Sequence, residues 1–139
     1  MRAVVDADCL IAGVLTPEGA TTEILDRWLL GAFELVVCPQ LIHEVTKAIL
    51  HPRIASKYVI SEEDVEALSL RLSGEGMMMD DPPDPPRVVP EDPGDDYLIA
   101  LAQQAAADYL VTRDQHFRDL RVEGVPILSP RSFLDVLQG

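Results

Sequence analysis

The order of short strand-like and helix-like segments is the feature that most constrains the fold of this chain. Short apolar runs recur at residues 2–6 (RAVVD), 33–38 (FELVVC), 109–112 (YLVT) and 125–128 (VPIL). Runs of this length are typical of buried strands. Because helix-like segments separate them, the strands are expected to pair in parallel through right-handed crossovers. We therefore expect an α/β fold in three layers, with a central parallel sheet of four to five strands flanked by helices.

The intervening helices are predicted from apolar residues at helical spacing. They are expected over 20–31, from 39 to a break or bend at Pro52, from 61 to the glycines at 74 and 76, over 95–107, over 114–120 and over 131–137. Thr21 or Thr22 is the expected cap of the first helix, and Ser129 with Pro130 caps the last. Residues 77–79, all Met, are interpreted as a loosely packed helix end.

The length of 139 residues predicts one domain, residues 1–139, and the Pro-rich stretch 80–94 is interpreted as a loop within it. No apolar run reaches the roughly 18 residues that a membrane span needs. The N-terminus lacks the order of a signal peptide, so we expect a cytoplasmic protein. Cys9 and Cys38 are then expected to be buried free thiols.

The formal net charge of −13 argues against a surface that coats nucleic acid, because such a surface is basic. It does not exclude an enzyme that acts on nucleic acid through metal ions. Eleven basic residues remain, nine of them Arg, and one face of the protein could carry several of these side chains.

Acidic residues follow the predicted strands. Asp6 ends the first strand, and Asp114 comes two residues after the third. Ligands of an open parallel sheet bind beyond the carboxyl ends of its strands, so both side chains could face one crevice. Glu44 lies in the helix after the second strand, at the edge of the apolar stripe that contains Leu41 and Val45.

Asp95 and Asp96 open the alanine-rich helix, and spacing favours Asp95 as the inward residue. Asp95 shares a side with the expected buried stripe of Leu98, Ala102 and Ala105, whereas Asp96 aligns with Ile99 on a more peripheral side. Asp96 is the second choice. Either carboxylate could instead only cap the helix, where the helix dipole favours it.

Four carboxylates in one crevice would repel one another unless they were protonated or held a cation. Ligands that are all oxygen favour Mg²⁺ or Mn²⁺ over zinc. Such an ion can activate water and neutralise charge on a phosphate. The pattern therefore points to chemistry on phosphates, and it explains why a buried strand would end in an acid.

Three segments, VVDADCLIAG, PQLIHEV and DPGDDYLIALAQQAAADYLVTRD, resemble the PIN-domain nucleases over nearly the whole chain. The similarity is closest to the small bacterial toxins of the VapC kind and related toxin components. The resemblance implies a PIN-like fold and a metal-dependent ribonuclease, a hydrolase that uses Mg²⁺ or Mn²⁺. Carried over by position, the family's acidic quartet falls on Asp6, Glu44, Asp95 and Asp114.

Neighbouring positions follow or depart from the family pattern. Thr112 matches the hydroxyl residue that supports the site, and Asp8 falls where the family has Asn or Ser, so it either adds a metal ligand or replaces a hydrogen bond. His116 stands where many relatives carry a further acid, which leaves a second metal position open. Arg113, beside the last acid, is the basic residue expected nearest a substrate phosphate.

The resemblance implies an endoribonuclease toxin of a type II toxin-antitoxin system, with RNA as substrate, a cognate antitoxin as partner and a homodimer as the active form. An apolar patch on the helices of residues 20–50 would form the dimer interface. The alternative is a PIN-like binding module that has lost turnover and acts as a platform for other proteins. A metal-dependent phosphatase is a third interpretation, and it would need a closed pocket.

Overall fold

A parallel sheet of five strands forms the centre of the molecule in the computed structural model, which describes residues 1–83, 96–115 and 124–139. The strands are β1 (Arg2–Val5), β2 (Glu34–Val37), β3 (Met77–Met78), β4 (Tyr109–Val111) and β5 (Ile127–Leu128). Their order across the sheet is β3-β2-β1-β4-β5, and each neighbouring pair is parallel. The predicted parallel sheet is confirmed.

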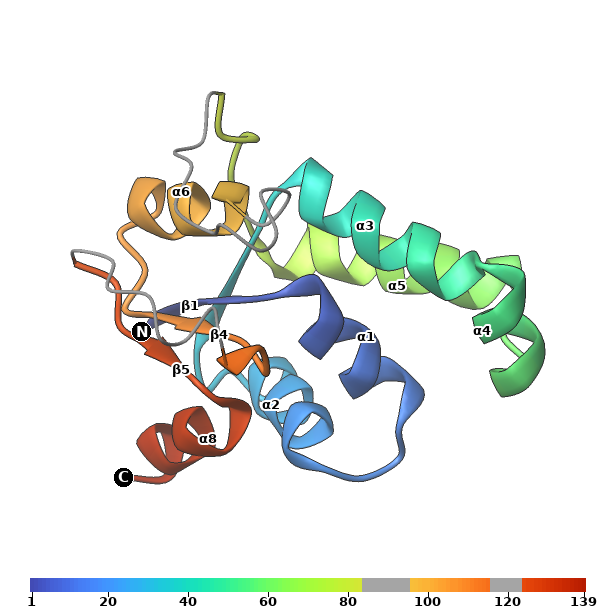
Figure 1. Cartoon of the computed structure of the whole chain (residues 1–139), viewed down its shortest axis with the longest axis horizontal. Coiled ribbons are helices and arrows are strands. Elements are labelled where there is room, and N and C mark those ends of the chain that lie inside the picture. The colour runs from blue at the N-terminus through green and yellow to red at the C-terminus, as the bar shows by residue number, and fades with distance from the viewer. Residues whose placement is uncertain (84–95, 116–123) are drawn as a thin grey trace.

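Helices cover both faces of this sheet (Figure 1). They are α1 (Ala7–Leu15), α2 (Ala20–Leu29), α3 (Pro39–Leu50), α4 (Pro52–Tyr58), α5 (Glu62–Glu75), α6 (Asp96–Gln104) and α8 (Pro130–Gln138). In the view of Figure 1, α3, α5 and α6 lie above the sheet, and α2 and α8 lie below it. Helices α3 and α5 pack together, as do α2 and α8. The three-layer α/β architecture is therefore confirmed.

The core lies between these layers. The apolar residues of β1, β2 and β4 are almost wholly buried because helices cover both sides of the strands, as in other parallel sheets. Cys9 and Cys38 are buried free thiols, as expected. Among the described residues, no helix has the length and apolar character that crossing a bilayer requires.

Helix α6 is buried on more sides than its sequence suggested. Ile99 is as inaccessible as Leu98, so the placement of Ile99 on a peripheral side was wrong. The helix lies over both β1 and β4, and its apolar residues are buried on more than one face. The choice of Asp95 over Asp96 rested on that contrast between faces, and it therefore stays a prediction.

Several local elements differ from the sequence-based expectation. Helix α1 was not predicted, because residues 7–15 lack the polar face that reveals an amphipathic helix. Helix α3 ends just before Pro52, one of the two predicted outcomes, but Pro52 also begins a further helix, α4, that was not predicted. The interpretation of residues 77–79 as a helix end was wrong, because Met77 and Met78 pair with β2 as an edge strand.

The cap of α2 is also different from the prediction. Gly19 occupies the N-cap position, and no side chain caps the helix. Thr22 donates instead to the carbonyl oxygen of Thr16, at 2.8 Å, and so ties the start of α2 to the end of α1. The predicted Ser129 cap of α8 is confirmed, since its hydroxyl accepts from the backbone N–H of Ser132. The helix predicted over 114–120 falls almost wholly outside the described residues.

Candidate active site

The carboxyl ends of β1 and β4 meet at the point where the strand order reverses. Strand β1 has β2 on one side and β4 on the other, and Val5 is in register with Val111. The backbone N–H of Asp6 donates to the carbonyl oxygen of Val111 at 3.0 Å. The residues that follow both strands are thereby fixed side by side, at the place where open parallel sheets bind their ligands.

Asp6 is a buried carboxylate at this edge, with 7% of its surface exposed. It is the N-cap of α1, where Oδ1 accepts from the backbone N–H of Cys9 at 2.8 Å. Oδ2 accepts from the hydroxyl of Thr112. Burial raises the pKa of Asp6, and these hydrogen bonds offset only part of that effect. A nearby cation would compensate the charge of such a group.

Thr112 joins the two acids that follow β1 and β4. Its side chain is fully buried, donates to Asp6 and accepts from the backbone N–H of Asp114 at 3.1 Å. The hydroxyl therefore orients the Asp6 carboxylate and holds the turn that contains Asp114. The side chain of Asp114 is exposed to solvent at this edge.

Glu44 lies in α3 and is partly buried. The hydroxyl of Tyr97, at the start of α6, donates to Oε2 of Glu44 at 2.9 Å. Tyr97 itself is almost fully buried, so its ring is held by packing. The hydrogen bond links the helix that carries Glu44 to the helix that begins at Asp96.

Asp8 is engaged by an arginine. Its Oδ2 lies 2.9 Å from Nη2 of Arg113, and both side chains are largely exposed. The hydrogen bond to Asp8 raises the pKa of Arg113. Two roles were predicted for Asp8, as an added metal ligand or as the replacement of a hydrogen bond. The contact with Arg113 is a hydrogen bond of the second kind. A role in metal binding stays a prediction.

The structure describes three residues of the predicted quartet: Asp6, Glu44 and Asp114. Thr112 bonds the carboxylate of Asp6 and the backbone N–H of Asp114, and Glu44 bonds Tyr97. Asp95 and His116 lie outside the described residues, and of Asp96 only the backbone, in α6, is described. Within residues 1–83, 96–115 and 124–139, no three His, Cys, Asp or Glu side chains are grouped as metal ligands. The predicted ligands are all carboxylates, and carboxylate oxygens are the ligand type that hard divalent cations take.

Sequence reasoning missed Tyr97 as a residue of this region. The signal for it was present, because a tyrosine directly follows Asp95 and Asp96 in an otherwise apolar helix. A buried tyrosine hydroxyl needs a hydrogen-bond partner. The search for carboxylates alone did not ask what that partner would be.

Comparison with known proteins gives one family match. The sequence pattern of the PIN domain matches residues 2–116, which is most of the chain. Among solved structures, FitAcB from Neisseria gonorrhoeae is similar, with 18% sequence identity and a TM-score of 0.45 over 93% of this chain and 98% of that one. No curated protein sequence matches.

Proposed function

This chain belongs to the PIN domain family, and from that premise we propose that it is a metal-dependent endoribonuclease. PIN domains are usually nucleases. The proposed reaction is hydrolysis of an RNA phosphodiester by in-line attack of water. The observation that carries the proposal is the buried Asp6 carboxylate at the carboxyl end of β1, next to Thr112 and the turn to Asp114.

The proposed ligands of Mg²⁺ or Mn²⁺ are Asp6, Glu44, Asp95 and Asp114, with Asp96 as the second choice to Asp95. A bound divalent ion would lower the pKa of a water molecule and neutralise charge on the scissile phosphate. Thr112 would orient one oxygen of Asp6, and Tyr97 would orient one oxygen of Glu44. The burial of Asp6 supports this assignment, because its hydrogen-bond partners in the described part of the chain are neutral donors and a buried carboxylate without a nearby cation is costly to ionise.

We further propose that the nuclease is the toxin component of a type II toxin-antitoxin system, acts in the cytoplasm as a homodimer and is restrained by an antitoxin. Exposed leucines within the predicted interface, residues 20–50, support a contact with another protein chain. Leu29 and Leu30 lie at the end of α2, and Leu50 lies at the end of α3. Leu29 and Leu30 are adjacent, and a contiguous apolar patch is typical of such contacts, whereas a single exposed leucine such as Leu50 is ordinary.

The nuclease proposal is tested with purified protein, structured and unstructured RNA, and either Mn²⁺ or EDTA. Asp6→Asn is the test variant, and Asp26→Asn is its control, since Asp26 is an exposed acid on α2. We expect the wild type and Asp26→Asn to cleave RNA in Mn²⁺ alone. Asp6→Asn is expected to lose at least about a hundredfold in rate, because a metal ligand and its charge are removed.

Two outcomes would contradict the proposal. Cleavage that persists in EDTA or in Asp6→Asn would exclude the metal mechanism. Absence of RNA cleavage, together with absence of Mn²⁺ binding in calorimetry, would favour a binding module without turnover.

A further inference from the structure

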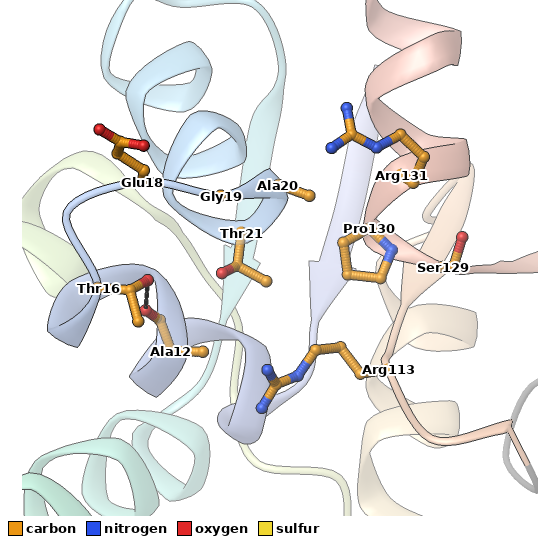
Figure 2. Close-up of a pocket in the computed structure, with 10 residues that line it drawn as sticks. All are labelled: Ala12, Thr16, Glu18, Gly19, Ala20, Thr21, Arg113, Ser129, Pro130 and Arg131. Atoms are coloured by element: carbon orange, nitrogen blue, oxygen red, sulfur yellow. Dashed lines mark hydrogen bonds between the residues drawn. The ribbon is translucent and has the colours of Figure 1, made fainter.

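A pocket of about 450 Å³ opens beside the edge of the sheet where Asp6 follows β1 and Asp114 follows β4, which we call the acidic edge. The pocket is lined by α1, by the segment that joins α1 to α2, by the start of α2 and by the start of α8. Arg113, which follows β4 between Thr112 and Asp114, also lines it. Figure 2 shows Arg131 and Arg113 at the two ends of the pocket lining, with Thr21 and Pro130 between them in this view. Arg113 is the residue that borders both the pocket and the acidic edge.

The two arginines differ in what they contact. Arg113 forms the ion pair with Asp8 described above. Arg131 forms no ion pair with any residue in the described parts of the chain. Arg53 likewise has no ion pair among the described residues, but Arg131 differs from it in lining the pocket. Glu18 also lines the pocket, and Figure 2 shows its carboxylate across the pocket from both guanidinium groups.

Thr21 supplies an independent sign that the pocket takes a ligand. Its side chain lines the pocket and is more than nine-tenths buried. Within the described residues its hydroxyl has no hydrogen-bond partner, in contrast to the hydroxyls of Thr16 and Thr22 nearby. A buried hydroxyl without a partner costs free energy, so a ligand that accepts its proton would be favoured.

The start of α2 adds further donors. Gly19 is the N-cap and has no side chain to occupy the first N–H groups of the helix. Free N–H groups at a helix start favour an anion. Two guanidinium groups, a threonine hydroxyl and this helix start therefore offer hydrogen-bond donors around one opening. A backbone phosphate carries a negative charge, and its oxygens only accept hydrogen bonds. It therefore matches that set of donors.

We infer that this pocket binds a backbone phosphate of the RNA strand next to the scissile phosphate, through Arg131, Arg113 and the hydroxyl of Thr21. The inference rests on the proposed function for the identity of the strand. Because Arg113 borders both places, a strand whose scissile phosphate lies at the acidic edge would continue into the pocket. The site would hold the strand in register without reading its bases.

Binding is measured with the full chain in EDTA and a fluorescein-labelled 2′-O-methyl RNA, which resists hydrolysis. Arg131→Gln is the main variant, and Arg53→Gln is the control, because Arg53 is an exposed arginine on α4, far from α8 in Figure 1. We expect Arg131→Gln to weaken binding about tenfold, since a charge-assisted contact to phosphate is lost. Arg53→Gln is expected to change it less than twofold.

Two further variants separate ligand binding from folding. Thr21→Val keeps the shape of the side chain, and we expect about threefold weaker RNA binding with an unchanged or higher melting temperature. Glu18→Gln removes a negative charge from the rim and is expected to strengthen binding about twofold. A change in opposite directions for Arg131→Gln and Glu18→Gln would support a phosphate in the pocket.

The inference is overturned if the wild type binds no RNA in EDTA, or if Arg131→Gln weakens binding no more than Arg53→Gln. It is also overturned if the wild type binds inorganic phosphate but not RNA. These binding measurements need neither metal nor turnover. A failure to cleave RNA would therefore contradict the nuclease proposal, whereas the binding measurements alone decide whether the pocket holds an RNA phosphate.

Discussion

The hydroxyl of Tyr97 in α6 donates a hydrogen bond of 2.9 Å to Oε2 of Glu44 in α3. The two residues are 53 positions apart, and the bond joins two helices on the same side of the sheet (Figure 1). A carboxylate on a helix surface samples several rotamers unless a partner selects one. Tyr97 therefore fixes where one oxygen of Glu44 points.

Replacing Tyr97 with Phe tests this positioning. The ring and its packing are kept, so we expect a loss of about 1 kcal/mol in unfolding free energy, the typical value of one hydrogen bond. If Glu44 binds the metal, Mn²⁺ affinity should fall about tenfold and kcat with it, while KM for RNA stays unchanged. Calorimetry and steady-state kinetics measure these quantities.

Tyr109→Phe is the matched control, because the ring of Tyr109 packs on Phe133 at the other end of the sheet. It should leave Mn²⁺ affinity unchanged. Equal metal affinity in the wild type and Tyr97→Phe would show that the hydrogen bond serves stability alone.

The burial of Asp6 predicts how the stability of the protein changes with pH. Its pKa is raised by burial, so the native state binds the proton more tightly than the unfolded state does. The stability from this group is fully present below the unfolded pKa of the carboxyl, and it is lost as pH rises through the folded pKa. At pH 7 without metal, Asp6→Asn should thus melt roughly 2–4 °C higher than the wild type.

The difference should shrink as pH falls toward 4 and the wild-type carboxyl becomes protonated. Millimolar Mn²⁺ should raise the melting temperature of the wild type but not of Asp6→Asn, because ligand binding stabilises the native state. Differential scanning calorimetry at several pH values checks both expectations. A wild type that is more stable than the variant at pH 7 in EDTA would contradict them.

Gly13 in α1 allows helix α2 to approach closely. A Cβ at this position would lie 2.9 Å from the carbonyl oxygen of Thr21 and 2.7 Å from Cδ1 of Leu25. Gly13→Ala should therefore lower the unfolding free energy by about 1–3 kcal/mol, the usual cost of overpacking.

Gly74→Ala is the control for helix propensity, since nothing lies within 4 Å of a Cβ in that part of α5. It should stabilise the protein by about 0.5–1 kcal/mol. Urea unfolding of both variants gives the comparison, and a stabilised Gly13→Ala variant would contradict the close packing of α1 on α2.

Asp81 caps α3 from a distant part of the chain. Its Oδ1 accepts from the backbone N–H of Gln40, in the first turn of the helix, at 2.8 Å. Asp81→Ala should lower the unfolding free energy by about 1 kcal/mol, as the loss of an N-cap does. Asp80→Ala removes the same charge one residue away and should change stability by less than about 0.5 kcal/mol. Similar losses in both variants would assign the effect to charge.

Strands β1, β2, β4 and β5 could be predicted because both faces of a parallel sheet are buried, which leaves short apolar runs such as RAVV and ELVV. The two-residue edge strand β3 was too short to give such a run. Helix α3 was equally clear, since Pro39 begins it and Leu41, Val45 and Ile49 repeat at helical spacing. Helix α1 was missed, although its cap was visible in Asp6. Nine mostly apolar residues gave no polar face, although Asp6 caps the helix and Cys9, Leu10 and Gly13 are buried.

In the candidate site, too, the residues placed by strand order could be predicted and those placed by tertiary packing could not. Position after a strand predicted that Asp6 would lie near Asp114, because parallel strands end at one edge. Tyr97 could be recognised as a tyrosine in need of a hydrogen-bond partner, but its pairing with Glu44 could not be predicted, since that depends on how α6 packs near α3. Of the pocket residues only Arg113 was predicted to lie near a substrate phosphate. The pocket itself was missed because its residues come from separate segments of the chain, and Arg131 and Thr21 belong to no motif.

The ion pair between Asp8 and Arg113 has a consequence for how an RNA complex would respond to ionic strength. A cation that binds nucleic acid releases condensed counter-ions, and the number released sets the slope of affinity against salt concentration. Arg113 already holds a protein carboxylate at 2.9 Å, so the pair approaches a phosphate as a nearly neutral unit. Arg131 would then account for most of the salt dependence at this pocket, and a count of its arginines would overestimate the slope.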